Sequence, residues 1–167
     1  MDKGGKKGTA YGYFILKPYK TMPSDALLTR LHRLRPDSER QWGNMSAHQV
    51  LPHLTDQIRI CLGELPSKPR GNTFTRKLMG WIALNLPLPM PKNMRTIAEL
   101  DPAKKYMTQP TDFERDLETL VAAYTRMLHL PETHHFEHPV FGRLSKKEVI
   151  HLTNLHLDHH LKQFSIE

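Results

Sequence analysis

The sequence predicts an all-α protein built as a four-helix bundle. Apolar residues recur at helical spacing in four long segments, capping residues or prolines and glycines mark the ends of those segments, and no alternating run has the length of a useful strand. With 167 residues, 38% hydrophobic and 25% charged, the chain has the size and composition of one soluble domain. We therefore expect a single helical domain over residues 21–167, preceded by a flexible basic arm over residues 1–20.

The first two helices have clear start and stop signals. Ser24 is a candidate cap before "DALLTRLHRL", which Pro36 should end. Ser46 is a candidate cap for "SAHQVLPHLTDQIRICL", and Gly63 follows that segment. Pro52 lies inside the second helix and lacks a backbone donor, so we expect a bend next to His53.

The middle of the chain is less regular. "TFTRKLMGWIALN" predicts a shorter helix, whereas "LPLPMPKN", which contains Pro87, Pro89 and Pro91, cannot be a regular element. We expect a long irregular crossover between the second and third main helices. Such a connection either forms the wall or lid of a site or lies over the bundle with no further role.

The last two helices each follow a predicted capping box. Thr111 and Glu114 precede "DLETLVAAYTRML", and Ser145 and Glu148 precede "VIHLTNLHLDHHLKQF". Together with the first two helices they complete the predicted bundle, an architecture that builds its sites from side chains pointing into the core.

Charge and cysteine content narrow the function classes. A net charge of +7 raises the question of nucleic-acid binding, but the basic residues are scattered without a groove-reading motif, so we do not expect that function. The longest apolar stretch, "LMGWIALNLPLPM", is too short and too interrupted to span a bilayer, so we expect no membrane segment. Because Cys61 is the only cysteine, no intramolecular disulfide is possible, and we expect a cytoplasmic protein.

Histidine is the compositional outlier, with eleven in the chain and three of them in "HLDHHLKQF". On the last helix His156 and His160 fall near the middle of the apolar face, roughly 40° apart, with His159 nearer its edge. Buried imidazoles need partners for both ring nitrogens. At this spacing two side chains can converge on one metal ion, although the spacing alone is weak evidence because such a pair is more often a hydrogen-bonded core pair.

A third ligand would have to come from another helix. On the second helix His48 and His53 lie about equally far from the centre of the apolar face, on opposite sides, so periodicity alone leaves both open. A predicted loop in "THHFEHPVFG" holds three further histidines, which we expect to be exposed or to cap backbone groups: His134, His135 and His138.

Three stretches resemble a known family: "WGNMSAHQVLPHLTDQI", "HPVFGRLSKKEV" and above all "HLDHHLKQF". They resemble the DUF1569 family of the DinB/YfiT-like superfamily of metalloenzymes. The resemblance implies a four-helix bundle with a divalent ion bound by His53, His156 and His160, and so decides between His48 and His53. It also implies three residues that would hydrogen-bond the ligand imidazoles: Asp158, His159 and Gln163.

The resemblance also carries an expected activity. Three neutral imidazoles favour Zn or Ni and leave open coordination positions. Superfamily relatives include transferases and isomerases that use low-molecular-weight thiols, so we expect the ion to activate such a thiol for transfer to a small-molecule substrate. The resemblance is also compatible with a homodimer.

Two other functions stay open. One is a metal-assisted hydrolase, in which the ion activates water. The other is a non-catalytic helical binding module with structural histidines, whose basic arm binds acidic partners.

Overall fold

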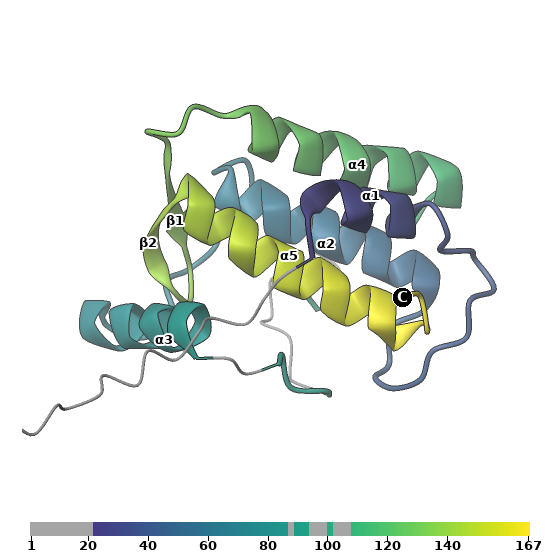
Figure 1. The fold of residues 1–167 in the computed structure, drawn as a ribbon, viewed down its shortest axis with the longest axis horizontal. Coiled ribbons are helices and arrows are strands. Elements are labelled where there is room, and N and C mark those ends of the chain that lie inside the picture. The colour runs from purple at the N-terminus through teal and green to yellow at the C-terminus, as the bar shows by residue number, and fades with distance from the viewer. Residues whose placement is uncertain (1–21, 87–88, 94–99, 102–107) are drawn as a thin grey trace, which may run out of the picture.

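The computed structural model describes residues 22–86, 89–93, 100–101 and 108–167. The predicted basic arm lies outside these residues. Within them the chain is mostly helical, with five helices and one two-stranded antiparallel sheet (Figure 1). The mostly helical class was predicted correctly, as was a shorter helix in addition to the four main ones. The small sheet was not predicted, so the chain is not strictly all-α.

Helix α2 (Ala47–Cys61) is the central helix of the fold. It contacts both α4 (Phe113–His129) and α5 (Lys146–Gln163), and α1 (Ser24–Leu31) lies against α5 (Figure 1). Twelve of the fifteen residues of α2 are buried, because neighbouring helices cover more than one side of it. Polar side chains on α2 are therefore held inside the protein.

Two of the predicted caps are confirmed. Ser46 forms a capping box with Gln49 at the start of α2, and Ser145 forms one with Glu148 at the start of α5. Helix α2 is continuous through the buried Pro52. Gly63, just beyond the C-cap of α2, has a positive φ of 75°.

Two other helix starts differ from the prediction. Helix α4 is capped by Asp112, whose Oδ1 accepts a hydrogen bond from the Arg115 amide at 2.9 Å. Thr111 instead donates its amide and hydroxyl to Asp116. A carboxylate accepts strongly at the positive end of a helix, which explains why Asp112 displaces Thr111. At α1, Ser24 is the first helical residue rather than the cap.

The sheet is a short hairpin that the sequence did not predict. Strand β1 (His135–His138) pairs with β2 (Gly142–Ser145), with Phe136 opposite Leu144. Four residues per strand are too few for a two-residue periodicity to stand out. His138 Nδ1 accepts hydrogen bonds from the amides of Val140 and Phe141, which holds the turn. His135 and His138 therefore lie in a strand, where a loop was expected.

Helix α3 (Thr73–Asn85) matches the predicted shorter helix and contacts β2 and α5. Gly80 allows this approach, because a Cβ there would lie 3.0 Å from the Phe141 carbonyl oxygen. The side of α3 turned away from the protein carries large exposed hydrophobic side chains: Phe74, Leu78, Met79 and Trp81. Nowhere in the described residues is a helix both long and apolar enough to cross a membrane.

Candidate metal centre

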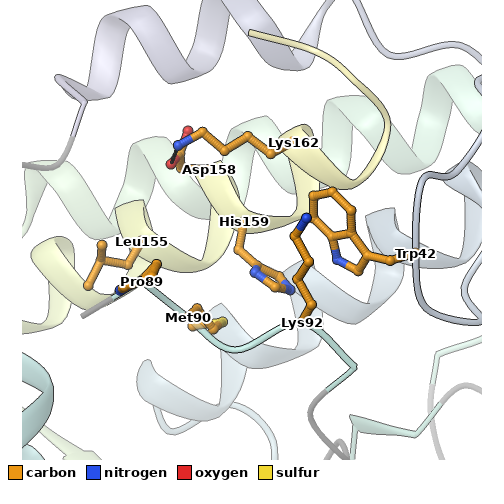
Figure 2. A pocket seen from close by; sticks show the side chains of 8 residues that line it. All are labelled: Trp42, Pro89, Met90, Lys92, Leu155, Asp158, His159 and Lys162. Atoms are coloured by element: carbon orange, nitrogen blue, oxygen red, sulfur yellow. Dashed lines mark ion pairs between the residues drawn. The ribbon is translucent and has the colours of Figure 1, made fainter.

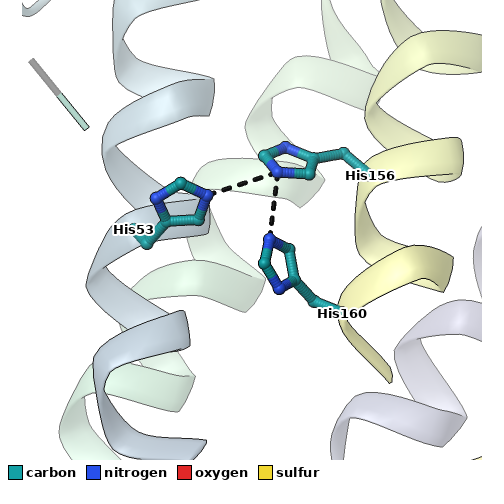
Figure 3. A group of neighbouring side chains, drawn as sticks. All are labelled: His53, His156 and His160. Carbon is teal, nitrogen blue, oxygen red and sulfur yellow. Dashed lines mark hydrogen bonds between the residues drawn. The ribbon is translucent and has the colours of Figure 1, made fainter. Parts of the chain in front are cut away.

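Three histidines from two helices converge between α2 and α5 (Figure 3). His156 Nε2 lies 3.3 Å from His53 Nε2 and 3.1 Å from His160 Nε2. All three candidate ligand atoms lie within 4.8 Å of one another. His48, the other candidate on α2, is elsewhere: its Nε2 contacts Asp116 Oδ2 at 2.8 Å. The structure therefore brings together the three residues that the resemblance indicated.

The other ring nitrogen of His53 is tied to the backbone. Nδ1 lies 2.9 Å from the carbonyl oxygen of the buried Leu100. A carbonyl can only accept, so Nδ1 carries the proton and donates it. In the neutral ring this leaves a lone pair on Nε2, which faces the other two histidines.

His160 is oriented in the same way by a side chain. Its Nδ1 lies 2.8 Å from Gln163 Oε1, and Gln163 Nε2 donates to the Trp42 carbonyl oxygen at 2.7 Å. The second contact fixes the orientation of the Gln163 amide, so its oxygen must face His160. His160 Nδ1 therefore donates, and its Nε2 also presents a lone pair to His156.

These contacts cannot all be satisfied by protons. His156 Nε2 can carry one hydrogen at most, so it can donate to His53 or to His160 but not to both. At least one of the two short nitrogen contacts then has no hydrogen between its atoms. A cation that accepts a lone pair from each Nε2 satisfies all three nitrogens at once, and imidazole nitrogen is a common ligand of divalent transition metals. The donor set therefore fits a metal ion.

Burial also keeps the three imidazoles in the form that binds metal. Desolvation is the largest cause that lowers the pKa of His53, and it likewise lowers the pKa values of His156 and His160 well below 6.5. The mutual repulsion of the rings in their charged forms adds to this effect. All three rings are therefore neutral at neutral pH, as ligation requires.

The sequence also matches the model of a protein family. The model of a family described as "Protein of unknown function (DUF1569)" matches residues 20–167. The chain belongs to the DUF1569 family. No curated protein and no solved structure matches it.

The residues expected to support the ligands in this DUF1569 protein lie in three different surroundings. Gln163 contacts His160 directly. Asp158 contacts none of the three histidines: its Oδ1 pairs with Arg30 at 2.6 Å and its Oδ2 with Lys162 at 2.8 Å. Asp158 thus joins α5 to α1. His159 has its ring centroid 5.2 Å from that of His160 and lines a pocket beside the histidines.

Sequence reasoning assigned no role to the segment that holds Gln163. Trp42 supplies the carbonyl that orients Gln163, and Gly43 follows it with a φ of 75°. A Cβ on Gly43 would lie only 2.6 Å from Gln163 Nε2, so a side chain there would displace the amide. Both residues stand in the stretch "WGNMSAHQV" that carries the family resemblance, which was the available signal.

The support for His53 was also not predicted. Asp56, one helical turn after His53, accepts hydrogen bonds from the amide and hydroxyl of Thr108 at 3.0 and 2.8 Å. Thr108 follows the crossover that contains Leu100. This contact ties Thr108 to α2, one helical turn from His53. Nothing in the spacing of these residues indicates such a contact, because the crossover has no periodicity.

The hairpin histidines of the DUF1569 chain are not among the candidate ligands. His138 caps the turn, and burial lowers its pKa to about 4. His135 is exposed and its Nδ1 donates to the Thr133 carbonyl. His134 stacks edge-on against Phe136. The expectation of exposed or capping roles therefore holds for His135 and His138.

Proposed function

We propose that this DUF1569 protein binds a divalent ion, Zn or Ni, through His53, His156 and His160. We further propose that the site activates a low-molecular-weight thiol for transfer to a small-molecule substrate. The observation that carries the proposal is the convergence of three Nε2 atoms, two of which belong to rings that separate hydrogen bonds orient, His53 to Leu100 and His160 to Gln163.

The residues of the chain have distinct parts in this proposal. His53 and His160 would present fixed lone pairs, and His156 would complete the ligand set from the same face of α5 as His160. An ion held by three neutral imidazoles lowers the pKa of a bound thiol, so that it reacts as a thiolate at neutral pH. Three protein ligands leave coordination positions for that thiol.

The surroundings favour thiol activation over a hydrolysis that depends on a side-chain base. The candidate ligand group contains histidines only, within the described residues. Among the residues that the structure describes, Asp56 and Asp158 are engaged elsewhere, Asp56 with Thr108 and Asp158 with Arg30 and Lys162. A hydrolase that deprotonates water through a side chain needs a free base near the ion. A thiol that ionises at the metal needs no such base.

Three broader features belong to the same proposal. We assign the fold to the DinB/YfiT-like superfamily as a four-helix bundle of α1, α2, α4 and α5, supported by the contacts of α2 with α4 and α5 and of α1 with α5. We place the protein in the cytoplasm, because thiols are kept reduced there and the one cysteine of this chain is free and buried. We infer a homodimer through the exposed apolar side of α3, because such patches mark interaction surfaces.

Metal content is the direct test of the site. Untagged protein is loaded with Zn or Ni, dialysed and analysed by plasma mass spectrometry beside His53→Ala, His156→Ala and the control His48→Ala. We expect about one ion per chain in the wild type and the control, and near none in the first two variants. Retention of the ion by both His53→Ala and His156→Ala would contradict the proposed ligand set.

Thiol dependence is the test of the chemistry. Metal-loaded protein is incubated with a small electrophile, with and without added thiol, and the product is measured by mass spectrometry. Thioether formation that requires both metal and thiol supports the transferase. Turnover without thiol would favour the hydrolase, and a protein that never binds metal would favour a binding module with structural histidines.

A further inference from the structure

A small pocket lies next to the candidate metal centre and has no role in the ligand set (Figure 2). It has a volume of about 110 Å³ and lies between α5, the segment that contains Trp42, and residues 89–92 of the crossover. The residues that line it are Trp42, Pro89, Met90, Lys92, Leu155, Asp158, His159 and Lys162.

The pocket and the histidine centre share a wall. His159 lines the pocket, and its ring centroid is 5.2 Å from that of His160. Trp42 also lines the pocket, and its carbonyl holds the Gln163 amide that orients His160. A molecule in this pocket would therefore be separated from the candidate ligand His160 by the side chain of His159.

The charged groups make the pocket attractive to an anion. The Lys92 ammonium stands 4.1 Å from the centre of the Trp42 ring, which holds it over the pocket (Figure 2). Within the described part of the chain, Lys92 has no ion-pair partner. The one acid of the lining, Asp158, is shared by Arg30 and Lys162. The positive charge of Lys92 is therefore not neutralised by the pocket itself.

The rest of the lining sets the kind of anion. Pro89, Met90 and Leu155 give the pocket an apolar surface. A cavity of about 150 Å³ can hold a benzene molecule, so this smaller pocket suits a short aliphatic chain. One unneutralised ammonium beside such a surface matches a single negative charge at the end of a few methylene groups, which is the chemistry of a short carboxylate.

We propose that this pocket binds the carboxylate of the thiol cosubstrate, with Lys92 as its cationic partner and Trp42 as one wall. The inference rests on the proposed function and narrows it: the cosubstrate is a short mercapto-carboxylate, whose thiol reaches the three histidines while its carboxylate stays in the pocket. The competing anion chemistry is a phosphate, which the experiment separates.

Trp42 provides a reporter that does not depend on turnover. The chain has two tryptophans, and Trp81 is 57% exposed on α3, away from the pocket. In the Trp81→Phe background, Trp42 is the single tryptophan. Zinc-loaded protein is titrated with 3-mercaptopropanoate and with the neutral 3-mercaptopropan-1-ol, and Trp42 fluorescence is followed. We expect the carboxylate to bind about fivefold more tightly, the contribution of one partly exposed charge pair.

Lys92→Met tests the assigned partner, with Lys147→Met as the control, an exposed lysine at the other end of α5. Lys92→Met should abolish the preference for the carboxylate and leave the affinity for the neutral thiol unchanged. Lys147→Met should leave both unchanged. Equal affinities for the two thiols in the wild type, or a preference that survives Lys92→Met, would overturn the proposal.

Two further titrations separate this pocket from the metal proposal. Propanoate, which has no thiol, is added to metal-free protein, and inorganic phosphate is added in parallel. Lys92-dependent binding of propanoate in a protein that takes up no metal would support the pocket while the proposed function fails. Stoichiometric metal with no propanoate binding would overturn the pocket alone. Tighter binding of phosphate than of propanoate would overturn the carboxylate assignment.

Discussion

The molecule has two groups of histidines that look alike in sequence and differ in structure. His156, His159 and His160 fall within five positions on α5, and His134, His135 and His138 fall within five positions around β1. On α5 the rings of His156 and His160 turn Nε2 toward a common point and meet Nε2 of His53 from α2. In the hairpin the rings serve the backbone or pack against Phe136 and Phe141.

The difference lies in what occupies Nδ1. In His53 and His160 this nitrogen donates to a fixed acceptor, so Nε2 is left free to bind an ion. In His138 it is Nδ1 itself that accepts two backbone amides. A dense run of histidines therefore indicates a metal site only where separate hydrogen bonds aim several Nε2 lone pairs at one point.

The largest expected effect is the stabilisation of the folded chain by a metal ion bound at the α5 histidines. We expect saturating Zn at about 100 times its dissociation constant to raise the free energy of unfolding by about 2.7 kcal/mol, because only the folded chain assembles the ligands. Urea unfolding with and without Zn measures this. His156→Ala should show no increase and His135→Ala the full one. Equal stabilisation of both variants would contradict the assignment.

Gln163 tests whether the orienting hydrogen bond matters. Gln163→Leu removes the acceptor of His160 Nδ1 but leaves all three ligands, so we expect metal affinity to fall about 10- to 100-fold. Competition with a chromophoric chelator measures the affinity. Asp158→Asn, on the same helix, should leave it unchanged because Asp158 pairs with Arg30 and Lys162 and hydrogen-bonds none of the three candidate ligands. An unchanged affinity in Gln163→Leu would mean that the rings are held by packing alone.

In the hairpin, the titration of His138 should contribute to the pH dependence of stability. Burial lowers the pKa of His138 to about 4 in the folded chain, against 6.5 for an exposed histidine. The unfolded chain therefore binds one more proton between these values, and stability is lost as the pH falls from 6.5 toward 4.

His138→Asn keeps an acceptor for the turn amides and does not titrate. In metal-free protein we expect the loss of stability between pH 7 and pH 5 to be about 2 kcal/mol smaller in this variant than in the wild type. Urea unfolding at both pH values measures the difference. Parallel losses in the two proteins would show that His138 is not a neutral, buried group.

The smallest effect concerns the glycine behind Gln163. Gly43 and Gly63 both have a φ of 75°, but only at Gly43 would a Cβ meet another atom within 4 Å, Gln163 Nε2 at 2.6 Å. Gly43→Ala should therefore destabilise the chain by about 1 kcal/mol more than Gly63→Ala, and it alone should weaken metal binding. Urea unfolding and chelator competition measure both effects. Equal effects of the two substitutions would mean that backbone strain at the positive φ, and not the contact with Gln163, accounts for the loss of stability.

The sequence predicts those elements whose signals are local. The cap at Ser46, the capping box at Ser145 and the helix over Thr73–Asn85 depend on neighbouring residues, and the structure has them. The hairpin was not predicted because strands of four residues are too short to show the two-residue hydrophobic periodicity of a strand. Two adjacent residues could both cap α4; Asp112 does so because its carboxylate is the stronger acceptor, and Thr111 bonds Asp116 instead.

In the candidate site, too, some residues could be predicted from local signals and others could not. The helical spacing of His156 and His160 is visible in the sequence, whereas the choice of His53 over His48 came from the family resemblance. Helical periodicity could not make that choice, since both lie equally far from the centre of the apolar face of α2. The Leu100 carbonyl could not be found at all, because a backbone group leaves no trace in residue type and reaches His53 across a segment without periodicity.

The separation of the proposed ligands along the chain has a consequence for topology. His53 and His156 are 103 positions apart, so an ion between them closes a loop of most of the chain. A permanent link over a loop of about 100 residues restricts the unfolded chain enough to add about 4.7 kcal/mol of stability in the chain-entropy account. With Cys61 as its only cysteine, this protein cannot make such a link within one chain by a disulfide. A bound ion would take the place of that crosslink and join the last helix to the second, so the supply of metal would also govern how long the folded chain lasts.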